Sequence, residues 1–154
     1  MDLSSILVPS AVSVIGQVTS KKRLFQQLGE IVSSAYGFDA STSVEALQNR
    51  ESLGPTGVGL GVALPHARIQ GLDKVAGAFL RIEKPLDFDA VDRQPVDLVF
   101  TLFAPLDSGV EHLKALALVA RTMRDSTICA KLRANADPST LHALLTGAPS
   151  SKAA

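Results

Sequence analysis

The sequence contains no tryptophan, one tyrosine and one cysteine among 154 residues, and charged residues make up only 19% of it. The single cysteine, Cys129, excludes an internal disulfide, and a lone cysteine is a poor basis for a structural zinc site. No lysine or arginine precedes Lys21, so the first residues lack the basic region of a secretory signal peptide. We therefore expect a cytoplasmic protein without membrane insertion.

An excess of charge of one sign is also missing, because 15 Lys and Arg residues balance 15 Asp and Glu residues. This balance argues against recruitment of nucleic acid or an anionic membrane by the overall charge of the molecule. Hydrophobic residues nevertheless form 46% of the chain, which is typical of a globular protein. A domain of this length buries about two thirds of its unfolded surface. The composition thus predicts one globular domain that does not bind nucleic acid.

Several motifs of ligand binding and catalysis are absent. The glycine-rich segment 54–61 lacks the Gly-Lys-Ser/Thr ending of a P-loop, and its spacing does not match the dinucleotide-binding pattern. His66, His112 and His142 are too far apart for a paired metal motif, and no Gly-x-Ser-x-Gly elbow occurs. We predict no metal and no cofactor, and we interpret the glycine run as a tight turn in which backbone segments pack closely. His142 is interpreted as a helix-flank histidine without chemistry, and Cys129 as a small packing residue.

The pattern of hydrophobic residues predicts alternating helices and strands. Helices are expected at 21–36 after the N-cap Ser20, at 43–53, from 108, at 126–134, and from Asp137 to Gly147. Strands are expected at 75–82 and 96–103, with shorter apolar segments at 62–64 and 86–88 and an early strand within 3–20. This alternation predicts an α/β fold with a covered sheet. We expect one domain over 1–147 and a disordered tail over 148–154, where small and polar residues have nothing to pack against.

The helix expected from Ser108 begins with a possible capping box, Ser108-Gly-Val-Glu111. Its expected apolar stripe consists of Val110, Leu113, Leu116, Ala117, Ala120 and Met123. His112 would lie in the first turn, where the helix dipole favours an anion and disfavours a charged imidazole. A neutral His112 could therefore donate a hydrogen bond to an oxyanion, and the alternative is an ordinary surface histidine.

His66 and Arg50 flank the glycine run. His66 follows Pro65 at the end of an apolar segment, a place that would hold its side chain rigidly at a sheet edge, so functional and structural roles are both open. Arg50 ends the second helix, where a cation already interacts favourably with the helix dipole. Its planar guanidinium could alternatively bind phosphate oxygens. Sequence spacing alone does not bring Arg50, His66 and His112 together.

The segment from Arg50 to Arg68, RESLGPTGVGLGVALPHAR, strongly resembles the type-2 IIA domains of the bacterial phosphotransferase system, the fructose, mannitol and nitrogen-regulatory class. The resemblance continues through 85–100 and 111–117 and extends over nearly the whole chain. It implies a single domain with a mixed β-sheet flanked by α-helices. It also implies that His66 is phosphorylated and that His112 and Arg50 stabilise the phosphoryl group.

Among these domains the chain most resembles the nitrogen-regulatory members. That resemblance implies a phosphohistidine carrier that is phosphorylated by NPr, an HPr-like carrier downstream of enzyme I, and that regulates partner proteins. Two alternatives stay open: a sugar-specific IIA component that passes phosphate to a IIB subunit, and a regulatory docking module without onward transfer. Two residues depart from the commonest family pattern, Pro55 in place of serine and Leu60 in place of a polar residue such as asparagine or histidine.

Overall fold

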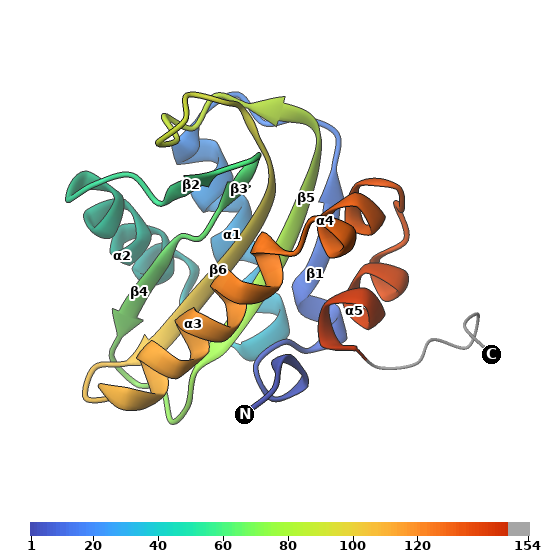
Figure 1. Cartoon of the computed structure of the whole chain (residues 1–154). Coiled ribbons are helices and arrows are strands. Elements are labelled where there is room, and N and C mark those ends of the chain that lie inside the picture. Colours follow the sequence, from blue (N-terminus) through green and yellow to red (C-terminus); the bar gives the residue numbers. More distant parts are fainter. Residues whose placement is uncertain (148–154) are drawn as a thin grey trace.

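A computed structural model describes residues 1–147, so the tail expected at 148–154 lies outside the described residues. A central β-sheet is covered by helices on both faces (Figure 1). One face carries α1 (Lys21–Tyr36) and α2 (Ala40–Ser52), and the other carries α3 (Val110–Arg124), α4 (Ser126–Arg133) and α5 (Pro138–Thr146). This arrangement confirms the predicted α/β fold. No helix within the described residues has the length and apolar character needed to cross a membrane.

The sheet is mixed, as the family resemblance implied. Its strands are β1 (Val12–Ile15), β2 (Gly57–Gly59), β3 (Val62–Ala63), β4 (His66–Ile69), β5 (Ala76–Leu86) and β6 (Val96–Pro105). The strand order is β1-β5-β6-β3-β2, and β4 also pairs with β6. β6 is parallel to β3 and β4 but antiparallel to β5, and β1 is parallel to β5. β3 and β4 therefore follow one another along the same edge of β6. Two short 3-10 turns, Leu3–Ser5 and Pro9–Ala11, precede β1.

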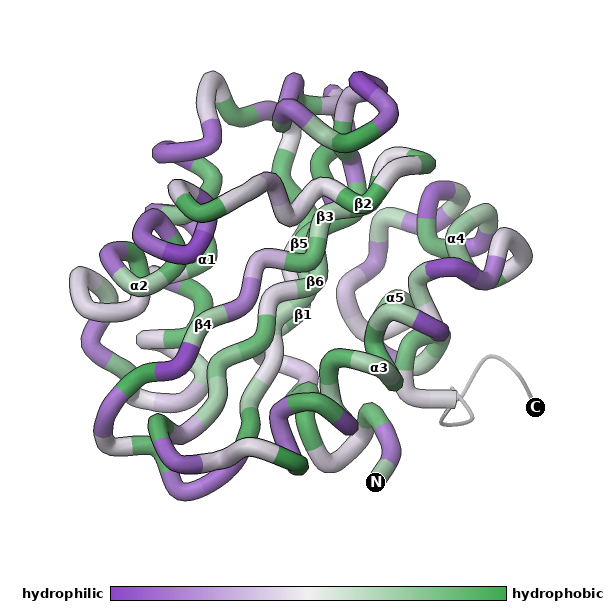
Figure 2. Tube along the Cα trace, turned by 60° about the vertical axis from the view of Figure 1, so that its left-hand side comes forward, coloured by the Kyte–Doolittle hydropathy of each residue, from purple (hydrophilic) through white to green (hydrophobic). Residues whose placement is uncertain are grey.

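The centre of the sheet forms the core. β5 and β6 run as largely hydrophobic segments between the two helical layers (Figure 2). Phe79 of β5 and Phe100 of β6 are fully buried and lie edge to face, with ring centroids 6.2 Å apart. A strand buried on both faces needs a nearly continuous apolar run, which explains why these two strands were predictable from the sequence.

Local capping sets the ends of two helices as predicted. The hydroxyl of Ser20 accepts a hydrogen bond from Arg23 N at the start of α1, and Gly37 ends the helix in the left-handed conformation at φ 78°. α5 begins at Pro138, and Gly147 follows its end at φ 70°. These signals depend on only a few neighbouring residues, and tertiary packing does not override them here.

Other boundaries differ from the prediction. α2 begins at Ala40 instead of Ser43, because the Asp39 carboxylate accepts a hydrogen bond from Thr42 N and caps the helix earlier. The apolar segment 86–88 is not a separate strand, since Leu86 is the last residue of β5. Part of the glycine run, Gly57–Gly59, forms the strand β2, where a loop was expected.

The capping box predicted for α3 is wrong. The Ser108 hydroxyl donates to Pro105 O at 3.0 Å, so it does not cap the helix, and Gly109 occupies the N-cap position. α3 therefore starts at Val110, and His112 is its third residue. His112 still lies in the first helical turn, as expected.

The predicted apolar stripe of α3 is also partly wrong. The residues that α3 buries against the protein are His112, Ala115, Val119 and Met123. Val110 and Leu113, which were expected on the buried face, are 63% and 66% exposed. The helix is rotated so that a histidine faces inward, and two large apolar side chains are left in solvent beside it.

Candidate functional site

His66 is held at an interruption in the sheet. It was expected to end an apolar strand, but it is the first residue of β4, because Pro65 has no N–H and separates β3 from β4. The carbonyl of Pro65 accepts hydrogen bonds from Leu102 N at 3.0 Å and from the buried Thr101 hydroxyl at 2.9 Å. The peptide group just before His66 is therefore fixed to β6 by two bonds.

The hydrogen bond of the His66 ring determines which nitrogen carries the proton. Nδ1 lies 2.8 Å from the carbonyl oxygen of Leu64. A carbonyl can only accept, so Nδ1 must donate. In the neutral ring the lone pair is then on Nε2, which makes Nε2 the nucleophilic atom.

His112 lies beside His66 and carries its proton on the other ring nitrogen. The two ring centroids are 5.8 Å apart and the ring planes are inclined at 67°. Arg68 Nε lies 3.3 Å from His112 Nδ1, and a guanidinium nitrogen can only donate, so Nδ1 accepts. The proton of neutral His112 is therefore on Nε2. His112 is only 8% exposed, and its Nε2 has no hydrogen-bond partner among the described residues.

Burial is the largest influence on both rings. It lowers the pKa of His66, an effect that Arg50 reinforces and that the Leu64 carbonyl and Glu51 oppose. Burial also lowers the pKa of His112, and the neighbouring His66 and Arg68 reinforce that shift. Since unperturbed histidine has a pKa near about 6.5, both rings are predominantly neutral at neutral pH. The pair then presents a lone pair on one ring and an N–H on the other.

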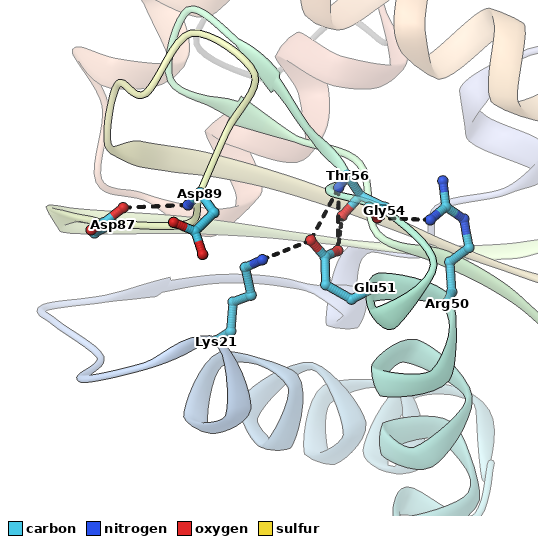
Figure 3. Close-up of polar contacts among 7 residues, drawn as sticks. All are labelled: Lys21, Arg50, Glu51, Gly54, Thr56, Asp87 and Asp89. Carbon is cyan, nitrogen blue, oxygen red and sulfur yellow. Dashed lines mark hydrogen bonds and ion pairs between the residues drawn. The ribbon is translucent and has the colours of Figure 1, made fainter.

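Arg50 completes the group of three residues. It is half-buried near the end of α2, and its Nη1 donates to Gly54 O at 2.9 Å at the start of the glycine run (Figure 3). Within the described residues its remaining N–H groups have no hydrogen-bond partner. Its charge is close enough to lower the pKa of His66. The three residues selected from the sequence therefore lie in one neighbourhood.

Glu51 anchors the segment that carries Arg50. Its carboxylate accepts hydrogen bonds from the N–H and hydroxyl of Thr56, and it forms an ion pair with Lys21 at 2.8 Å (Figure 3). The Lys21 ammonium group also lies 4.7 Å from the ring centroid of Phe88. Glu51 and Arg50 point to opposite sides of the chain that follows α2 (Figure 3), and Glu51 fixes this segment to α1 through Lys21.

We predict that Glu51→Ala lowers the free energy of unfolding by about 2–4 kcal/mol, because it leaves the polar groups of Thr56 and the ammonium of Lys21 without their partner. Denaturant unfolding followed by circular dichroism measures this change. Glu111→Ala is the matched control, since Glu111 is 60% exposed and lies 3.9 Å from Lys114. Exposed pairs of this kind contribute about 0–1 kcal/mol. Equal losses in the two variants would contradict the anchoring role.

The glycine run packs closely against its neighbours, as the sequence indicated. A Cβ on Gly57 would lie 2.9 Å from the Cα atom of Ala90. Gly61 has φ 80°, and a Cβ there would lie 2.5 Å from Nη2 of Arg133. The run brings β2 and β3 against the loop before β6 and against the end of α4. It therefore serves a packing requirement, consistent with the absence of a nucleotide-binding pattern.

Leu60, one of the two departures from the family pattern, forms the tip of this run. Its side chain is 78% exposed and its backbone is left-handed at φ 58°. Asp92 accepts from its N–H at 2.9 Å, and Arg133 Nη2 donates to its carbonyl at 2.8 Å. Asp97 forms an ion pair with Arg133 and so completes the support of the tip. These contacts involve the backbone of Leu60, so the residue type of its side chain does not alter them.

Two residues of the site were not selected from the sequence. The sequence predicted no partner for Glu51, and it did not distinguish Arg68 from the other basic residues. A strand signal for Arg68 did exist, because alternate residues of a strand share a face. His66 and Arg68 lie on one face of β4, and Ala67 and Ile69 are buried on the other.

The remaining histidine and the cysteine have structural contacts. His142 Nε2 donates to Leu7 O at 2.8 Å and so attaches α5 to the N-terminal segment. Cys129 is 6% exposed, and its thiol donates to Met123 O at 3.2 Å. Burial raises the pKa of the Cys129 thiol, which keeps it protonated. Neither residue belongs to the neighbourhood of His66.

Comparison with known protein families places the chain in one of them. The profile of the phosphoenolpyruvate-dependent sugar phosphotransferase system EIIA 2 family matches residues 5–148. The chain belongs to the EIIA 2 family. Membership identifies it as a phosphotransferase-system component of the IIA type, a class with a role in phosphoryl transfer.

Relatives of this EIIA 2 chain include nitrogen regulatory proteins. The one from Bradyrhizobium diazoefficiens is 41% identical over 153 residues, covering 99% of this chain and 100% of the relative. The one from Escherichia coli is 36% identical over 95% of this chain and 90% of the relative. The crystal structure of nitrogen regulatory protein IIA-Ntr from Neisseria meningitidis has a TM-score of 0.86 at 36% identity and covers 94% of this chain and 99% of its own. The mannitol IIA structure from Escherichia coli, at 20% identity, a TM-score of 0.74 and coverage of 90% and 97%, shares the fold.

Proposed function

We propose that this chain is a nitrogen-regulatory phosphohistidine carrier that accepts a phosphoryl group on His66 Nε2 from NPr, an HPr-like carrier. One observation carries the proposal: the ring of His66, with its lone pair on Nε2, lies 5.8 Å from the ring of His112, whose buried Nε2–H has no partner within the described residues. A buried donor without a partner is costly. An anionic phosphoryl group on the neighbouring ring would supply the missing acceptor. The nitrogen regulatory relatives support the assignment.

The transfer step follows from the protonation of His66. The Nε2 lone pair attacks the phosphorus of the phosphohistidine on the donor, on the side opposite the donor nitrogen. The new N–P bond forms as the old one breaks, and the electron pair returns to the donor ring, which is protonated on its other nitrogen and so leaves as a neutral imidazole. No proton has to leave His66, because its proton is on Nδ1 and stays bonded to Leu64 O. The reaction is nearly symmetrical, so catalysis consists mainly of positioning and charge stabilisation.

Charge stabilisation is the role we propose for His112 and Arg50. The phosphoryl oxygens carry most of the negative charge in the transition state. The Nε2–H of His112 and the unpaired N–H groups of Arg50 are donors already in place, and preorganised donors in a partly buried site stabilise such charge effectively. No metal or other cofactor is required for this step.

The donor carrier would dock on the exposed apolar surface beside His112. Leu106, Val110 and Leu113, at the start of α3 and in the turn before it, are 56%, 63% and 66% exposed. Exposed apolar groups gathered in one place commonly mark a protein contact. Because Val110 and Leu113 flank His112 in sequence, a protein covering them would also exclude water from the His66–His112 pair.

We predict that Leu113→Asp weakens binding of the phosphocarrier by about 10-fold or more, since it places a charge in an apolar contact. Titration calorimetry with purified carrier measures the Kd. Val91→Asp is the matched control: Val91 is 69% exposed, but it lies before β6, whereas α3 follows that strand. The ten residues of β6 separate the two ends by roughly 30 Å. Equal weakening by both substitutions would argue against docking on α3.

The proposed function is tested by incubating the chain with phosphoenolpyruvate, enzyme I and the HPr-like carrier. We expect one acid-labile phosphoryl group per chain, and peptide mapping by mass spectrometry should locate it on His66. Omission of the carrier should prevent labelling. Absence of labelling with the complete system, or labelling at another residue, would contradict the proposal.

A second candidate is a sugar-specific IIA component that passes the phosphoryl group to a IIB subunit. It is favoured by a relative named fructose-specific EIIA component from Haloferax volcanii, 30% identical over 85% of this chain. The fate of the phosphate distinguishes the two: rapid loss to a IIB subunit supports sugar transport. Retention until hydrolysis, with partner binding that differs between the two states, supports regulation. Identical partner lists for the wild type and the phosphate-mimicking His66→Asp would argue against phosphorylation as a switch.

A further inference from the structure

Arg68 contacts Nδ1 of His112, the ring nitrogen other than the Nε2 that is proposed to donate to the phosphoryl group. Its Nε–H donates to Nδ1 at 3.3 Å, and the two residues come from β4 and α3, 44 positions apart. Arg68 is largely exposed while His112 is buried. The Arg68 guanidinium therefore reaches from the exposed surface to the buried ring of His112.

The ring of His112 has three alternative protonation states. It can carry its proton on Nε2, carry it on Nδ1, or carry a proton on both nitrogens. A donor fixed against Nδ1 opposes the second and third alternatives, because an Nδ1–H would point at the N–H of Arg68. Only the first alternative gives His112 a donor for the site and an acceptor for Arg68. The groups that act on the charge of His112 are His66 and Arg68, and both oppose a second proton.

This arrangement matters because His66 and His112 are chemically the same side chain. A site with two equivalent imidazoles has no built-in distinction between the nucleophile and the hydrogen-bond donor. The Leu64 carbonyl fixes one ring with its lone pair on Nε2, and Arg68 fixes the other with its proton on Nε2. His66 thus has an acceptor as its partner and His112 has a donor, and these two contacts assign opposite roles to the neighbouring histidines.

We propose that Arg68 is a positioning residue for phosphoryl transfer, which holds His112 neutral and oriented with its Nε2–H toward the phosphoryl group on His66. The proposal rests on the proposed function, although the contact that it describes exists before any phosphate is bound. Arg68 acts here through His112 alone, so its effect should be visible on the nitrogens of the His112 ring.

The test is nitrogen-15 NMR of the histidine rings, measured across a pH titration in the wild type and in Arg68→Met. We expect wild-type His112 to show a protonated Nε2 and an unprotonated, hydrogen-bonded Nδ1 down to a pH below the usual histidine range. In Arg68→Met the Nδ1 signal should lose its hydrogen-bonded character, and the protonation midpoint of His112 should rise. Arg68→Lys keeps the charge but not the fixed Nε donor, and it should restore the midpoint partly.

Single-turnover transfer from the phosphorylated carrier gives the functional readout. Arg68→Met should slow transfer at saturating carrier by about 10-fold, by analogy with the loss found when the outer partner of a metal-ligating histidine is removed, and it should leave KM for the carrier unchanged. Arg121→Met is the control. It also removes one positive charge, but from a position on α3 that lies nine residues, roughly 13 Å, beyond His112. It should leave both the spectra and the rate unchanged.

Two results would overturn the proposal. One is an unchanged ring spectrum and titration of His112 in Arg68→Met, whatever happens to the rate, because Arg68 would then act without His112. The other is a changed spectrum with a wild-type rate, since the orientation of His112 would then not matter for transfer. Failure of the proposed function looks different: wild-type protein would not be phosphorylated at all, while the spectra would still report the contact between Arg68 and His112.

Discussion

His66→Gln is expected to abolish phosphorylation of the chain. Glutamine is similar in size to histidine and can donate a hydrogen bond, but its amide nitrogen has no lone pair available for attack on phosphorus. The fixed Nδ1–H of His66 directs a single nucleophilic atom, Nε2, away from Leu64. No other residue of this neighbourhood offers an equivalent atom, because the Nε2 of His112 carries a proton. Labelling with phosphoenolpyruvate, enzyme I and the carrier should therefore fall below detection.

The control for this experiment is His142→Gln. His142 hydrogen-bonds to Leu7 and lies outside the site, so its substitution should leave labelling at the wild-type level while it tests whether loss of any histidine perturbs the protein. Circular dichroism should confirm that both variants are folded. Persistent labelling of His66→Gln would remove His66 from the mechanism.

His112→Ala is expected to slow phosphoryl transfer by about 100-fold while His66 is still labelled at long times. The reason is that removal of one preorganised donor from a charge-stabilising site typically costs about 10²–10³ in rate. The nucleophile itself is untouched, because its orientation depends on Leu64 and Pro65 and not on His112. Rapid-quench measurement of a single turnover from the phosphorylated carrier separates this loss of rate from a loss of binding.

His112→Gln helps to separate chemistry from packing in this experiment. His112 is buried, so alanine leaves a cavity as well as a missing donor. Glutamine largely fills the space and can place an amide N–H near the position of Nε2, and it should recover part of the rate. Equal rates for His112→Ala and the wild type would exclude His112 from charge stabilisation. Equally slow rates for His112→Ala and His112→Gln would show that filling the cavity does not restore transfer, so the loss would not come from packing.

Much of the framework was predictable because its signals are local. The Ser20 and Gly37 caps and the apolar runs of β5 and β6 depend on neighbouring residues or on burial on both faces. The α3 start was mispredicted because Ser108, although correctly spaced for a capping box, bonds to Pro105 instead. The path of the chain before the helix decides whether the serine hydroxyl bonds to a preceding carbonyl or to the free N–H groups of the helix. The motif itself does not contain this information.

The candidate site was predictable as a set of residues but not as a geometry. Resemblance selected His66, His112 and Arg50, and the fold brings them together. The assignment of protons in the histidine pair could not come from the sequence, because it depends on Leu64 O in one case and on Arg68 in the other. The contact with Arg68 crosses from a strand to a helix, so no spacing rule connects its two residues.

The break between β3 and β4 has a consequence for how mutations affect this site. The groups that orient His66 are main-chain carbonyls, those of Leu64 and Pro65, and a carbonyl survives nearly every side-chain replacement. The groups proposed to help it, from His112, Arg50 and Arg68, are all side chains and can be lost singly. Substitutions of these side chains should therefore lower the rate of phosphoryl transfer by widely different amounts. Complete loss of phosphorylation should require a change at His66 itself or unfolding of the sheet around it.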